Sequence, residues 1–69
     1  MATDPLVTLM RALVIACESG RSTSLRRLAS DAGFSFSTTQ RLHEEMRRRG
    51  WLDGAGMPTE KGLMACGRV

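Results

Sequence analysis

The chain has 69 residues, of which 42% are hydrophobic and 25% charged, so we expect one domain over residues 1–69, without room for a catalytic cleft and a separate substrate domain. All but one of its ten basic residues are arginine, and the net charge of +3 favours an anionic partner, although such a charge also serves solubility. The longest apolar run, Ala12 to Cys17, is far too short to cross a bilayer and no signal peptide is visible, so we expect a soluble, cytoplasmic protein without a membrane partner.

The first predicted helix covers residues 5–19. Asp4 can cap its free N–H groups, and Pro5 suits the first helical position because a proline lacks the N–H that would have no partner there. An apolar stripe follows at three- and four-residue steps, formed by Leu6, Leu9, Met10, Leu13, Ala16 and Cys17. Further apolar residues widen this stripe, so we expect the helix to be covered on more than one side until Gly20 ends it.

A second helix is predicted over residues 24–32, with its N-cap among Ser22, Thr23 and Ser24. Its single apolar face consists of Leu25, Leu28, Ala29 and Ala32. Gly33 then ends the helix and permits a left-handed backbone turn.

The third predicted helix, residues 38–49, is unusually polar. Ser37 and Gln40 stand three residues apart and predict a capping box, so the helix should begin at Ser37. Leu42 and Met46 are its only clear apolar anchors. The last turn is rich in cations, which suit the helix dipole: Arg47, Arg48 and Arg49 precede a terminal Gly50.

The remaining residues predict a small wing and a short helix. Residues 51–59 should form two short strands around a glycine turn, with Pro58 on an edge because it cannot donate to a ladder. Trp51 should pack back onto the core, and Thr59 should cap a last helix over residues 60–66. The expected fold class is therefore mostly α with a small two-stranded β-wing: a winged helix-turn-helix with a three-helix core, a short hairpin and a short C-terminal helix.

The second and third helices have the spacing of a helix-turn-helix motif. Ala29 must be small because the two helices cross beside it, and Gly33 must turn the chain between them. The later helix then projects from the body and can enter a major groove. The candidate DNA-binding residues are Ser24, Arg26, Arg27, Ser35, Phe36, Ser37, Thr38, Gln40, Arg41, Arg47 and Arg48. Phe36 has a second interpretation, as an apolar plug between the two helices.

The run LRRLASDAGFSFSTTQRL, residues 25–42, followed by the Gly-Trp-Leu of residues 50–52, resembles the winged-helix domain of IclR-type bacterial transcription regulators. The later TEKG, residues 59–62, resembles the segment that closes the wing in MarR-like regulators. Together the resemblance spans roughly residues 6–63. It implies duplex DNA binding, with the DNA face at the residues that match Ser37, Thr38, Gln40 and Arg41.

The sequence departs from this family at three points. Thr39 and His43 stand where aliphatic core residues are usual, the wing carries no arginine, and no effector-binding domain follows. We expect either a small stand-alone regulator of transcription, such as a repressor of the kind that phages and mobile elements encode, or a domain of a longer regulator. Specific binding should need a homodimer, formed through the helix of residues 5–19 or the C-terminal segment.

Two other classes of function are weighed against DNA binding. A winged-helix module that docks on a replication, recombination or regulatory protein is favoured by the uncharged wing and by Glu44 and Glu45, which would repel DNA if they faced it. An enzyme is disfavoured, since no paired carboxylates, phosphate-binding glycine loop or nucleophile–base spacing is present. Cys17 and Cys66 form no C-x-x-C pair, so we expect free thiols, no metal, no cofactor and no small-molecule ligand.

Overall fold

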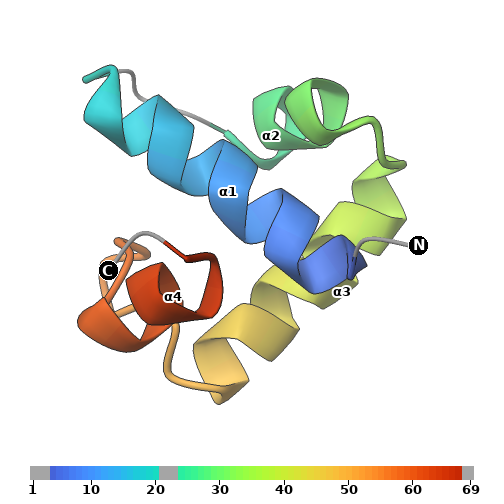
Figure 1. Ribbon diagram of the computed structural model, residues 1–69. Coiled ribbons are helices and arrows are strands. Elements are labelled where there is room, and N and C mark those ends of the chain that lie inside the picture. The colour runs from blue at the N-terminus through green and yellow to red at the C-terminus, as the bar shows by residue number, and fades with distance from the viewer. Residues whose placement is uncertain (1–3, 21–23, 68–69) are drawn as a thin grey trace.

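The computed structural model describes residues 4–20 and 24–67, and in these residues there are four helices, of which three pack around the first. They are α1 (Pro5–Glu18), α2 (Leu25–Ala32), α3 (Phe36–Arg48) and α4 (Glu60–Ala65). α1 crosses the middle of the molecule and contacts each of the other three, while α2 also packs against α3 (Figure 1). None of these helices is long and apolar enough to traverse a membrane.

The start and the buried stripe of α1 follow the sequence prediction. The N–H of Leu6 donates to Oδ1 of Asp4 at 2.9 Å, and Pro5 is the first helical residue. The buried side chains of α1 are Leu6, Leu9, Met10, Leu13, Val14 and Ala16. Ile15, however, stays 50% exposed, so the helix is not covered on every apolar side.

The corner between α2 and α3 is formed by Gly33, as predicted. Gly33 lies in the left-handed region, at φ 78°, where a side chain would be strained. Its N–H donates to the carbonyl oxygen of Ser30 at 3.3 Å, and the N–H of Phe34 donates to that of Ala29 at 2.9 Å. These two bonds form a Schellman motif, which ends a helix and turns the chain away from it. Ser24 is the N-cap of α2; Ser22 and Thr23, the other predicted candidates, lie outside the described residues.

The predicted start of α3 was wrong by one to two residues. The N-cap is Ser35, whose Oγ accepts the N–H of Thr38 at 3.2 Å, so Ser37 lies inside the helix and the predicted box with Gln40 does not cap it. Ser35 takes this role because it is the second residue after the Gly33 corner, where the backbone is still extended.

The far end of α3 repeats the same termination. Gly50, at φ 79°, donates its N–H to the carbonyl oxygen of Arg47 at 3.1 Å, and the N–H of Trp51 donates to that of Met46 at 2.9 Å. This turn directs Trp51 into the core, where it is only 9% exposed, as predicted.

The predicted two-stranded β-wing is absent, so the expected winged fold class was wrong. Between Trp51 and Thr59 the only ladder contact is an isolated antiparallel bridge from Leu52 to Pro58, and no strand occurs in the described residues. Asp53 explains the difference, because its Oδ1 accepts the N–H groups of Ala55 and Met57, each at 2.9 Å. The side chain thus closes the loop, and Pro58 has no N–H with which to extend a ladder.

Gly62 lets α4 lie directly against the chain at Trp51. A Cβ atom on Gly62 would meet the carbonyl oxygen and the Cβ of Trp51 and the Cε of Met10. The residue is buried, so the added carbon has no solvent to move into. A glycine that weakens α4 as an isolated helix is therefore required by its packing.

We expect Gly62→Ala to lower the free energy of unfolding by about 1–2 kcal/mol, because overpacking against backbone outweighs the gain of about 1 kcal/mol in helix propensity. Urea unfolding followed by circular dichroism measures this. Gly54→Ala is the control, since its Cβ would meet nothing within 4 Å. A Gly62→Ala protein as stable as the Gly54→Ala protein would contradict the close approach of α4.

Candidate nucleic-acid interface

α3 is buried along one side only. Thr39 and Met46 are both 0% exposed, and Leu42 packs against the core beside them. The exposed residues of α3 are Phe36, Ser37, Gln40, Arg41, Glu44, Arg47 and Arg48. The third helix is therefore held by a narrow apolar edge, and its polar side is open along its length.

Thr39 replaces an aliphatic core residue without leaving a polar group unpaired. Its Oγ1 donates to the carbonyl oxygen of Ser35 at 2.9 Å, across one turn of the helix. A buried hydroxyl with a hydrogen-bond partner avoids the main cost of its burial. The sequence reasoning noticed the unusual residue but missed its partner, because the helix start had been placed at Ser37.

Two of the candidate DNA-binding serines also serve the fold. Ser35 Oγ caps α3 and donates to Oγ1 of Thr38 at 2.8 Å, which leaves the proton of the Thr38 hydroxyl available. Ser24 Oγ caps α2 by accepting the N–H of Arg27 at 3.2 Å. Ser37 is exposed. Replacing Ser24 or Ser35 would therefore disturb a helix end as well as any DNA contact.

The arginines of this region divide into paired and unpaired groups. Glu45 binds Nη1 of Arg48 at 3.2 Å and Nε of Arg49 at 2.8 Å. The hydrogen bond from Arg49 is the main reason that the pKa of Glu45 lies below its ordinary value; desolvation opposes it, and the charges of Arg48 and Arg49 add to it. A partnered Arg48 is a weaker candidate for phosphate contact than its exposure alone indicates.

The unpaired group comprises Arg26, Arg27, Arg41 and Arg47, which form no ion pair within the described part of the chain. Arg26 and Arg27 lie in the first turn of α2, and Arg41 lies midway along the open side of α3. Arg26 contacts the start of α3, with its Cζ over the Phe36 ring at 4.9 Å from the centroid. Sequence reasoning selected both residues separately and missed the contact between them.

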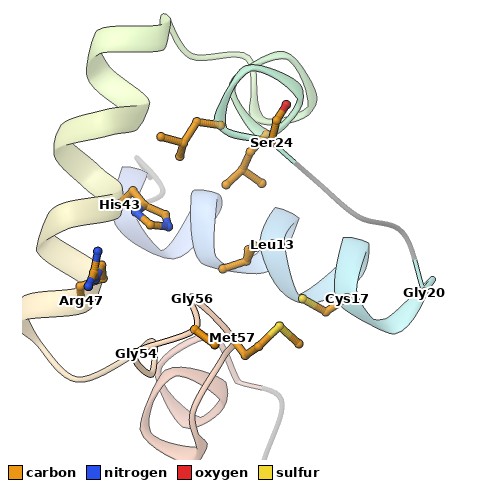
Figure 2. A pocket seen from close by; sticks show the side chains of 12 residues that line it. Leu13, Cys17, Gly20, Ser24, His43, Arg47, Gly54, Gly56 and Met57 are labelled. Atoms are coloured by element: carbon orange, nitrogen blue, oxygen red, sulfur yellow. The ribbon is translucent and has the colours of Figure 1, made fainter.

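Arg47 lies on a different edge of α3, beside His43, where both line an open groove of about 640 Å³ (Figure 2). The groove is also lined by Leu13 and Cys17 of α1 and by Met57, which lies in the loop between α3 and α4. The full lining is Leu13, Cys17, Gly20, Ser24, Leu25, Leu28, His43, Arg47, Gly54, Ala55, Gly56 and Met57. The structure thus separates Arg47 from Ser37 and Arg41, with which the sequence had grouped it.

His43 is the one histidine of the chain and lies half-buried in the wall of this groove. Burial lowers its pKa below the ordinary value of 6.5, the charge of Arg47 lowers it further, and Glu44 partly opposes both. His43 is therefore neutral at pH 7, as a packing residue rather than an anion-binding cation.

We expect acidification below about pH 6.5 to destabilise the domain through His43, since the unfolded chain takes up the proton before the folded one does. The free energy of unfolding should fall as the pH drops from 7.5 towards the lowered pKa of the folded state. His43→Gln should flatten this dependence. Urea unfolding of both proteins at several pH values between 7.5 and 5.5 measures it, and identical slopes would contradict the assignment. Glu45, with a pKa held below 4.5, does not titrate in this window.

Comparison with known proteins gives no assignment for this site. The chain matches no protein family, no curated protein and no solved structure. No group of three or more histidine, cysteine, aspartate or glutamate side chains in residues 4–20 and 24–67 could hold a metal ion. Both cysteines are free thiols, as predicted. The interface therefore remains a candidate that depends on geometry and charge.

Proposed function

We propose that this chain binds duplex DNA, inserts the open side of α3 into the major groove, and regulates transcription. The observation that carries the proposal is the combination of a sharp corner at Gly33 with an α3 whose polar side is uncovered. A helix of diameter about 10–12 Å fits a major groove about 12 Å wide. The resemblance of residues 25–42 to IclR-type regulators supports the same reading.

The residues on this side have the chemistry that base edges require. Gln40 can bind adenine through two hydrogen bonds, and Arg41 can bind guanine or a phosphate in the same way. Ser37 and Thr38 add short hydroxyl donors near the helix N-terminus, which favours a phosphate. Arg27, in the first turn of α2, supplies a further unpaired charge for the DNA backbone.

We expect Arg41→Ala to weaken duplex binding by about 1–3 kcal/mol, because it removes a charged side chain that can form two hydrogen bonds to the DNA at once. Fluorescence anisotropy with a labelled random-sequence duplex, repeated over a salt series, measures the loss. Lys61→Ala is the control, since it removes an equal charge from the exposed side of α4. If Arg41→Ala still melts cooperatively and binds as tightly as the unmodified protein, Arg41 is not at the interface.

Specific binding is proposed to involve two copies on a two-fold DNA site, since one short helix contacts few base pairs. Two apolar side chains support a dimer surface: Ile15 of α1 is 50% exposed and Met64 of α4 is 60% exposed. Ile15→Glu or Met64→Glu should shift the protein towards monomers in sedimentation velocity and weaken binding to a two-fold site. A wild-type protein that stays monomeric on DNA would contradict this surface. Such a regulator would act in the cytoplasm of a bacterium, where the DNA is.

The groove beside His43 supports a second candidate function, a module that docks on another protein. Leu13 and Leu28 give the groove apolar walls, and Met57 at its rim is 49% exposed. Salt separates the two functions: affinity for DNA falls steeply as salt rises because counterions are released, whereas an apolar contact is little affected.

A further inference from the structure

Packing of the hydrophobic core does not explain why Phe36 lies against Arg26. Phe36 is 37% exposed, and it is not among the hydrophobic residues that pack against the core, whereas Phe34 is. Phe36 is therefore not a fully buried plug, although it does join α3 to α2. Its ring contacts the guanidinium group of Arg26, at 4.9 Å from the ring centroid.

The ring holds Arg26 without neutralising it. Arg48 and Arg49 are also held in place, but by the carboxylate of Glu45, which cancels part of their charge. Arg49 in addition lies over the Trp51 ring, at 5.7 Å from the centroid, so what distinguishes Arg26 is that it has a ring and no carboxylate partner among the described residues. A phenyl ring attracts a cation through its quadrupole and carries no net charge. A guanidinium has five N–H groups, more than one ring can occupy, so Arg26 keeps donors for an oxygen ligand.

The position of the pair connects the two helices of the motif. Arg26 is the second residue of α2, and Phe36 is the first residue of α3. A guanidinium fixed at this point lies beside the start of the helix that would enter the groove. It has no carboxylate partner among the described residues, so its charge is free for an anion.

We propose that Phe36 is a positioning residue that holds Arg26 to clamp one phosphate of the DNA backbone beside the start of α3. This proposal rests on the proposed DNA-binding function and specifies one contact of it that does not depend on the DNA sequence. Holding the guanidinium before binding reduces the side-chain entropy that is lost when a phosphate is gripped. Arg26 supplies the charge, and Phe36 acts only through Arg26.

The test is a double-mutant cycle on the full chain with Arg26→Gln, Phe36→Leu and the double variant. Anisotropy with a labelled random-sequence duplex gives affinity and its dependence on salt. Arg26→Gln should reduce the salt slope by about one phosphate contact, close to 0.9. Phe36→Leu should weaken binding about 2- to 5-fold, the value of an exposed cation–π contact, with little change in slope. In the Arg26→Gln background, Phe36→Leu should have no further effect.

Phe36→Trp and Arg49→Gln complete the design. Tryptophan is the best cation–π partner, so Phe36→Trp should restore wild-type affinity, which a purely structural role for the phenyl ring would not predict. Arg49→Gln removes an equal charge that Glu45 already neutralises, so it should change the slope less than Arg26→Gln does. If Phe36→Leu does not melt cooperatively, the slope of Arg26→Gln and the affinity of Phe36→Trp still decide.

Two results would overturn the clamp while leaving DNA binding intact. One is a wild-type protein that binds DNA with a salt slope that Arg26→Gln does not change. The other is an equal loss from Phe36→Leu with and without Arg26, since additive effects mean that the ring acts independently of the guanidinium. A wild-type protein that does not bind duplex DNA would overturn both the clamp and the proposed function.

Discussion

The left-handed turn at Gly33 is the constraint on which the arrangement of α3 depends. At φ 78° the chain leaves α2 sharply, and two backbone bonds to Ala29 and Ser30 fix the exit. Two residues later Ser35 caps α3, and its carbonyl oxygen accepts the buried hydroxyl of Thr39. The corner, the cap and the buried threonine together set the rotation of α3, and that rotation leaves Ser37, Gln40 and Arg41 in solvent.

The chain holds its arginines in two chemically different ways, and this organises the charge of the interface. At the end of α3, Glu45 binds Arg48 and Arg49, which stabilises the last turn and lowers the local charge. At the start of α3 an uncharged ring contacts Arg26, and the charge is retained. The charge of Arg26 is therefore left unpaired at the start of α3, where the helix would meet DNA.

Capping residues and glycines predicted the helix ends correctly wherever only one residue could take the role. Asp4 and Pro5 fixed the start of α1, and Gly33 and Gly50 fixed the ends of α2 and α3, because few residues other than glycine adopt a positive φ. The start of α3 was misplaced because Ser35 and Ser37 are both good caps. The choice between them depends on the distance from the Gly33 corner, which is a tertiary property.

The wing failed for a comparable reason. Glycine turns and short apolar segments predict a hairpin. Instead, the carboxylate of Asp53 accepts two backbone N–H groups of the loop, and this side-chain bonding replaces the expected strand pairing. That Arg47 leaves the side of α3 that carries Arg41 follows from helix periodicity, since six residues at about 3.6 per turn place the two about 120° apart. That Phe36 meets Arg26 depends on the crossing of two helices, whereas residue types and spacing identify only the candidates.

The central claim is that the open side of α3, rather than the groove beside His43, meets the partner. An NMR titration of isotopically labelled protein with a short duplex DNA tests it most directly. The account predicts that backbone amide shifts cluster in residues 24–27 and 35–41, at the starts of α2 and α3. Shifts confined to Leu13, Cys17, His43 and the 54–57 loop, or no shifts at all, would contradict it.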